Sequence, residues 1–324
     1  MRHFKWAMSG LFAAMLALAA TPATAQLGGP PIRIIFPFAA GGSGDTLARL
    51  IAEKLHEGLG RTVVVEDRTG GAGRIGVQAV KHAAADGDTL LLTPIAPMSI
   101  YQLVYKALDY DPINDFAAVS QLGTFDFGIA VNPQLGIATL KDLVAWAKAN
   151  PNKANYGIPA AGTLPHFLGV MFGRAAGLDL NHIAYRGSAA ALADVVAGHV
   201  PMIVTTTADL VQMHKAGKVR VLATSDKARS PFLPDVPTFS EAGYDLVANG
   251  WYGMFAPAKT PPEVIDRYSK IIAAAVHSPE MKAKFAVFGL KPTGTTAAEL
   301  TKIQKDDSAV WAPAVKASGF TARD

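Results

Sequence analysis

Short apolar runs alternate with amphipathic segments through the first third of the chain. Residues 32–36 form an apolar run that predicts a buried strand, and the apolar positions between 47 and 55 then repeat with helical spacing. The runs at residues 63–66 and 89–93 predict two more strands, with a helix over about 76–84 between them. Strands that alternate with helices in this way predict an α/β fold with a largely parallel sheet.

The same alternation continues to the end of the chain. The proline-rich stretch 230–243 is expected to be irregular. A mature chain of about 300 residues favours two domains. Further strands are predicted at residues 126–131, 155–158, 182–185, 202–206, 219–224 and 251–257, and further helices at residues 140–149, from about 165, and at 189–197, 262–277, 279–288 and 297–318.

The first residues have the order of a secretory signal peptide. A short basic start is followed by an apolar run from Trp6 to about Ala20 and then by the small residues Ala23-Thr24-Ala25. The apolar run is shorter than the ~20 residues that span a bilayer as a helix. We therefore predict that residues 1–25 are cleaved on export to the periplasm and that no stable membrane insertion remains. The alternative is an uncleaved membrane anchor.

Charge and cysteine content narrow the function classes further. The chain has 30 Lys and Arg residues against 26 Asp and Glu residues, and loss of Arg2 and Lys5 with the signal leaves a nearly neutral protein. A nucleic-acid partner would favour a basic stripe, so none is expected. The chain has no cysteine, which excludes disulfides but does not argue against export, because a chain of this length can bury enough core without them.

Small residues gather in five loops, each between a predicted strand and a predicted helix. In a parallel sheet such loops lie at the carboxyl ends of the strands, where ligands bind. Each loop opens a helix whose first N–H groups lack internal partners and carry a partial positive charge. Facing loops of this kind form an anion site without arginine, and a carboxylate is a natural ligand. Alternatively, the glycines and hydroxyls serve only as caps and turns. The loops lie at residues 38–45, 70–76, 93–99, 162–166 and 186–188.

Catalytic and cofactor motifs are weak. Residues 71–76 match G-x-G-x-x-G, but the match follows the second strand, and no acidic residue ends the next strand, so we expect no cofactor. Ser43 lacks the final glycine of a G-x-S-x-G nucleophile elbow. The histidines show no metal-ligand spacing, so no metal is expected. His166 remains the one fair candidate for acid–base chemistry.

Several single residues allow two interpretations. His166 either lines the cleft as a donor or bonds to nearby backbone at the start of its helix. Asp45 is either a ligand contact or an acid favoured by the helix dipole. Arg186 either pairs with a carboxylate or braces its loop through a salt bridge. Trp251 is expected to pack where the two domains cross over rather than to stack on a ligand.

The order and spacing of these motifs are similar to those of a known family. Pro37-Phe38-Ala39-Ala40-Gly41-Gly42-Ser43-Gly44-Asp45, followed by Ala48-Arg49, resembles the first signature of the Bug family, the extracytoplasmic binding proteins of tripartite tricarboxylate transporters. No single motif is strong, but together they extend nearly to the C-terminus. The other matching segments are residues 66–76, 86–91, 155–166, 182–187 and 229–243.

The resemblance implies the two-lobed architecture of periplasmic binding proteins, with mostly parallel sheets and a hinge of crossing strands. Lobe 1 would comprise residues 26–127 plus 250–324, and lobe 2 residues 128–249. The lobes would close on a ligand like a Venus flytrap. By position, the resemblance implies ligand contacts from Phe38, Ala39, Ser43 and Asp45 in lobe 1, and from Gly162, Thr163, His166 and Ser188 in lobe 2. The neighbouring loop and strand-end positions add Gly44, Thr93, Arg186 and Thr205 to the predicted site.

The function implied is capture of a small organic carboxylate, an aliphatic or aromatic mono- or dicarboxylate, for the membrane subunits of such a transporter. The protein is expected to work as a monomer and not as an enzyme. Two alternatives remain, a periplasmic hydrolase or oxidoreductase, and a ligand sensor for a membrane kinase.

One departure from the family pattern bears on the ligand. An acidic residue is common near the end of the strand at 202–204, where this chain continues with Thr205-Thr206-Thr207. A ligand amino group would then lack a partner there. A simple carboxylate is therefore expected to fit better than an amino acid.

Overall fold

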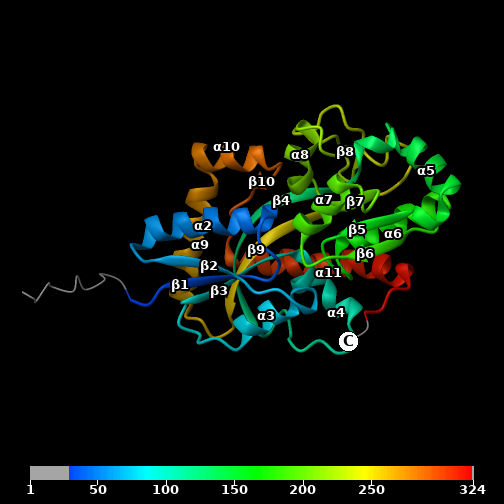
Figure 1. Cartoon of the computed structure of the whole chain (residues 1–324). Coiled ribbons are helices and arrows are strands. Elements are labelled where there is room, and N and C mark those ends of the chain that lie inside the picture. Colours follow the sequence, from blue (N-terminus) through cyan, green and yellow to red (C-terminus); the bar gives the residue numbers. More distant parts are fainter. Residues whose placement is uncertain (1–28, 323–324) are drawn as a thin grey trace, which may run out of the picture.

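The computed structural model describes residues 29–322 (Figure 1), so the predicted signal peptide lies outside the described residues. The chain begins with three parallel strands, β1 (Ile32–Phe36), β2 (Val63–Asp67) and β3 (Thr89–Pro94). Helices α2 (Ser43–Leu59) and α3 (Arg74–Lys81) connect them, and the short helical turn η1 (Gly71–Gly73) precedes α3. The strands and α2 agree with the hydrophobic pattern, and α3 lies slightly earlier in the chain than predicted.

Two long strands cross between the parts of the molecule. β4 (Phe116–Val131) pairs with β9 (Asn249–Pro257) over residues 116–126, and its last residues pair with β7 (Met202–Thr206) and β8 (Arg220–Thr224). The sequence predicted only residues 126–131 of β4, because polar residues interrupt its first part. One of them, Ser120, is buried, and its hydroxyl donates to the carbonyl oxygen of Thr295 at 2.7 Å.

The second group of strands repeats the parallel arrangement. β5 (Asn155–Ile158) pairs in parallel with β6 (Asn181–Ala184) and with β7. Helices α5 (Leu140–Ala149), α6 (Leu164–Ala176) and α7 (Ser188–Ala197) follow the predictions closely. The sequence analysis missed α8 (Thr207–Lys215), which begins directly after β7. The hydroxyl of Thr206 accepts a hydrogen bond from the N–H of Asp209 and caps this helix.

The strands form one curled sheet in the order β2-β1-β3-β9-β4-β7-β5-β6, and β8 and the short β10 (Lys291–Pro292) also pair with β4. Every antiparallel pairing between these strands involves β4 or β9, and the other pairings are parallel. Figure 1 shows two groups of elements, with β1–β3 on the left and β5–β8 on the right, joined by β4 and β9. The predicted α/β class is confirmed.

The C-terminal helices pack beside this sheet. They are α9 (Pro262–Val276), α10 (Pro279–Val287) and α11 (Ala297–Ser318), as the periodicity predicted. α11 contacts both groups of elements. The side-chain amide of Gln304 donates to the carbonyl oxygens of Met98 and Pro112, and Arg174 of α6 donates to the carbonyl oxygen of Ser318. The remaining short helical segments are η2 (Ala96–Ile100), α4 (Tyr101–Val104), η3 (Pro133–Leu135) and η4 (Pro151–Lys153).

Candidate functional site

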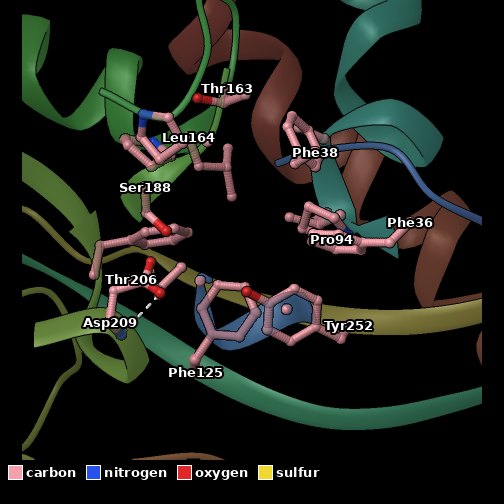
Figure 2. A pocket seen from close by; sticks show the side chains of 18 of the residues that line it. Phe36, Phe38, Pro94, Phe125, Thr163, Leu164, Ser188, Thr206, Asp209 and Tyr252 are labelled. Carbon is pink, nitrogen blue, oxygen red and sulfur yellow. Dashed lines mark hydrogen bonds between the residues drawn. The ribbon is translucent and has the colours of Figure 1, made fainter. Parts of the chain in front are cut away.

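A cavity opens where the carboxyl ends of the parallel strands meet (Figure 2). The volume of the cavity is about 70 Å³, which suits a small molecule. Both groups of strands contribute to its wall. The lining residues are Phe36, Phe38, Ala39, Gly42, Gly44, Pro94, Ile95, Ala96, Phe125, Phe127, Pro159, Thr163, Leu164, Pro165, Gly187, Ser188, Thr206, Asp209 and Tyr252.

Aromatic rings form much of the cavity wall. Phe125 lies 4.8 Å from Tyr252 between ring centroids, and Phe36 lies 5.9 Å from Phe38 in an edge-on arrangement. Gly44 allows the ring of Phe36 to pack against the start of α2, because a Cβ atom there would lie 2.5 Å from Phe36 Cζ. The wall therefore suits a ligand with an apolar body.

Three helices begin at the cavity wall without a side-chain cap from the residue that precedes them. Gly42 precedes α2 and Gly187 precedes α7, and neither has a side chain that could accept from the helix. Thr163 precedes α6, but its hydroxyl donates to the carbonyl oxygen of Ala160 at 2.7 Å and does not cap the helix. These helix starts therefore present N–H groups and partial positive charge to the cavity.

Among the other helices, α3 and α9 also begin without a side-chain cap, whereas α8, which begins at the cavity, is capped by Thr206. The starts of α5, α10 and α11 do not line the cavity, and the side chains of Thr139, Ser278 and Thr296 cap them. A missing cap normally leaves a helix less stable by about 1 kcal/mol. The uncapped starts at the cavity leave N–H groups that can donate to an anionic ligand.

Direct hydrogen bonds join the two groups of elements beside the cavity. The N–H of Ala39 donates to the carbonyl oxygen of Arg186 at 2.9 Å, and the N–H of Ser43 donates to Asp209 Oδ1 at 2.8 Å. The Ser43 hydroxyl also lies 3.1 Å from the Tyr252 hydroxyl. The structure is thus closed around the cavity.

Asp209 corrects the expectation drawn from the threonines at the end of β7. Its Oδ2 accepts hydrogen bonds from the hydroxyls of Thr205 and Thr206, each at 2.9 Å. The carboxylate lines the cavity and lies close to the end of that strand. The chain therefore does provide an acidic group there, and the argument against a ligand amino group loses its basis.

The structure brings only part of the predicted site to the cavity wall. Phe38, Ala39, Gly44, Thr163 and Ser188 line it. The other predicted residues do not line the cavity but lie in the same loops or next to residues that do. These are Ser43, Asp45, Thr93, Gly162, His166, Arg186 and Thr205.

His166 is buried behind the loop that precedes α6. Its Nδ1 lies 3.2 Å from the N–H of Gly162 and accepts its hydrogen bond, and its ring lies 4.1 Å from His182 and 4.4 Å from Phe320. Burial, with a smaller contribution from His182, lowers the pKa of His166 to about 3. The neutral ring braces the loop, as one of the two interpretations of the sequence proposed.

The remaining polar residues of the predicted site hold backbone or neighbouring side chains. Asp45 accepts the N–H of Gly41 at 2.9 Å and forms an ion pair with Arg49 at 2.8 Å. The Thr93 hydroxyl donates to the carbonyl oxygen of Pro94 at 3.2 Å. Arg186 is exposed, and its carbonyl oxygen rather than its guanidinium group holds Ala39.

Sequence reasoning missed several residues of the cavity wall. Phe125 and Tyr252 come from the crossing strands β4 and β9, and Asp209 comes from the unpredicted helix α8. The family resemblance implied crossing strands, but the sequence analysis did not place side chains from those strands at the cavity. Trp251 itself packs as expected, because it is buried beside Phe255 and does not line the cavity.

The glycine motif at residues 71–76 also lies outside the cavity wall. Gly76 serves close packing, because a Cβ atom there would lie 2.9 Å from Pro37 Cα. Within residues 29–322, no group of His, Asp or Glu side chains has an arrangement that could hold a metal ion. In that same range, none of the helices has both the length and the apolar composition to cross a membrane.

Comparisons with known proteins identify the family of this chain. The model of the tripartite tricarboxylate transporter family receptor matches residues 47–320. Protein BugT of Bordetella pertussis is 33% identical over 315 residues, which cover 97% of each chain. The structure of the periplasmic binding protein BugD has TM-score 0.86 and 30% identity, covering 90% of this chain and 99% of that chain. An R. palustris protein solved with adipate has TM-score 0.87 and 29% identity, covering 90% of this chain and 98% of that chain.

These similarities confirm the predicted family and the fold of a periplasmic binding protein, in which two lobes are joined by crossing strands. The family is periplasmic, and two of the solved neighbours are a periplasmic transporter and a periplasmic binding protein. The chain belongs to the tripartite tricarboxylate transporter receptor family and is similar to its Bug proteins.

Proposed function

We propose that this protein is exported to the periplasm, captures a small organic carboxylate and delivers it to the membrane subunits of a tripartite tricarboxylate transporter. One observation carries the ligand class. The helices α2, α6 and α7 begin at the cavity wall, α6 and α7 have no side-chain cap, and no described lining residue is a cation. Main-chain N–H groups would therefore bind the carboxylate.

The comparisons support the same ligand class. The R. palustris neighbour was solved with adipate, a dicarboxylate, and the family is named for tricarboxylate transport. Membrane subunits as partners, cleavage of residues 1–25 and a monomeric state follow the family resemblance and the signal-like N-terminus.

We further propose that the lobes are residues 26–127 plus 250–324 and residues 128–249, and that β4 and β9 act as the hinge. Both strands pass between the two groups of elements. Rotation about them would open the cavity, and the ligand would select the closed state. The hydrogen bonds of Ala39 to Arg186 and of Ser43 to Asp209 would break on opening.

Within this site, Phe38, Ala39, Gly44, Thr163 and Ser188 are proposed to contact the ligand. Ser43, Asp45, Thr93, Gly162, His166, Arg186 and Thr205 are proposed to support those contacts. The position of His166 favours binding over catalysis, because its ring nitrogen Nδ1 is engaged with backbone and the residue does not line the cavity.

A thermal-shift screen of mono-, di- and tricarboxylates, each beside its neutral amide, tests the proposal. A ligand at a hundred times its dissociation constant adds about 2.7 kcal/mol to the free energy of unfolding. We expect at least one acid to raise the melting temperature and its amide to have no effect. The proposed function is wrong if no carboxylate stabilises the protein, or if amides stabilise it equally well.

A further inference from the structure

Asp209 is the only charged residue among the described residues that line the cavity. We propose that it determines ligand specificity, so that the protein prefers acids with one carboxylate on an apolar body and rejects acids with a second carboxylate. This inference rests on the proposed function, because it assumes that a carboxylate binds in the cavity. It adds the class of acid, which the family resemblance leaves open.

The carboxylate of Asp209 is held in place by both groups of elements. Oδ1 accepts the N–H of Ser43 at 2.8 Å, and Oδ2 accepts the hydroxyls of Thr205 and Thr206, each at 2.9 Å. Moving the carboxylate aside would break these three hydrogen bonds, including the one that joins α2 to α8. A ligand entering the closed cavity therefore meets a negative charge at a fixed position.

The Asp209 carboxylate already accepts a hydrogen bond from the start of α2. The N–H of Ser43 is the first of α2, and it is the group that would otherwise be open to an anion. The starts of α6 and α7 remain for the ligand. Figure 2 shows Thr163 and Leu164 of the α6 start at one end of the cavity, and Thr206 and Asp209 at the other.

No lining side chain compensates a second ligand carboxylate. The described wall contains no Arg, Lys or His, and its remaining polar side chains are the hydroxyls of Thr163, Ser188, Thr206 and Tyr252. An acid bound at the α6 and α7 starts would extend its second carboxylate toward Asp209 or onto the aromatic wall. Like charges repel in the first case, and in the second an anion loses its hydration without a partner. A fixed like charge is a common device for rejecting a competing ligand.

Two pairs of acids test the inference, since the members of each pair share a carbon skeleton and differ by one carboxylate. The pairs are hexanoate with adipate, and 4-methylbenzoate with terephthalate. Isothermal titration calorimetry on the mature protein should show binding for at least one pair. Within that pair, the monocarboxylate should bind at least tenfold more tightly than the dicarboxylate. Asp209→Asn keeps an acceptor for Ser43 and removes the charge, so the preference should fall at least fivefold.

Asp235→Asn is the matched control, because it removes an exposed carboxylate outside the cavity wall and should leave the preference unchanged. Binding of the dicarboxylate as tightly as the monocarboxylate by the unmodified protein would overturn the inference without any variant. An unchanged preference in folded Asp209→Asn would overturn it as well. If none of the four acids binds and the wider screen finds no carboxylate ligand, the proposed function itself fails.

Discussion

His166 should make the stability of this protein fall as the pH falls from 6.5 toward 3. Burial lowers the pKa of His166 to about 3, whereas the ordinary value is 6.5. Between these values the unfolded chain binds a proton that the folded chain does not. The free energy of unfolding therefore decreases as the pH decreases, by up to about 1.4 kcal/mol per pH unit. The contribution is fully present above pH 6.5.

The size of the effect follows from the two pKa values. Between pH 6 and pH 4.5 the linkage relation gives a loss of about 2 kcal/mol from this one group. His166→Asn removes the titrating ring and keeps an acceptor for the N–H of Gly162. Urea unfolding followed at several pH values should therefore show a decrease with pH that is smaller by about 2 kcal/mol in the variant.

The control addresses the adjacent ring. Partial desolvation also lowers the pKa of His182, but this residue is far less buried than His166, so His182→Asn should remove a smaller part of the pH dependence. Each protein is compared with itself at pH 6, because either substitution also alters packing. An equal pH dependence in the unmodified protein and His166→Asn would refute the reasoning. An NMR titration showing His166 with a pKa near 6.5 would refute it directly.

Two glycines give further predictions. Gly44→Ala places a Cβ atom 2.5 Å from Phe36 Cζ, so the ring of Phe36 should move toward the cavity. Calorimetry should then show acid binding that is at least tenfold weaker than in the unmodified protein. Unchanged affinity would contradict this prediction. Gly169→Ala places a Cβ atom 2.2 Å from Tyr156 Cε2, and this overpacking, about 1–3 kcal/mol, should outweigh a gain of about 1 kcal/mol in helix propensity. The melting temperature of Gly169→Ala should therefore fall. It should fall further than that of the control Gly173→Ala in the same helix, where the new Cβ atom would lie 3.3 Å from its nearest neighbour, the carbonyl oxygen of Leu178. A rise in the melting temperature of Gly169→Ala would contradict the packing argument.

Local patterns predicted most of the fold because the strands of both lobes are short and apolar. The first part of β4 was missed because Ser120, Gln121 and Gly123 interrupt its apolar run, and their environment depends on distant segments. Helix α8 was missed because its start is a threonine run that also suits a strand. Its beginning depends on a hydrogen bond from the N–H of Asp209 to the side chain of Thr206.

The sequence predicted those parts of the site that lie in loops directly after parallel strands. Loops after parallel strands meet at one edge of a sheet, so Phe38, Thr163 and Ser188 could be expected at one cavity. Tyr252 and Asp209 reach the same cavity through the crossing strand β9 and through α8, and no local pattern gives that placement. The role of Asp209 needed the structure most, because it depends on its contact with Ser43 across the two lobes.

The central claim is that helix-start N–H groups bind a ligand carboxylate. The most direct test follows the backbone amides of the ¹⁵N-labelled, deuterated protein by NMR while adding the acid that stabilises it best. The account predicts that the amide protons of Leu164 and Ser188 shift downfield, and that the matched neutral amide does not shift them. Saturable binding of the acid that leaves these amides unchanged and shifts others would contradict the account.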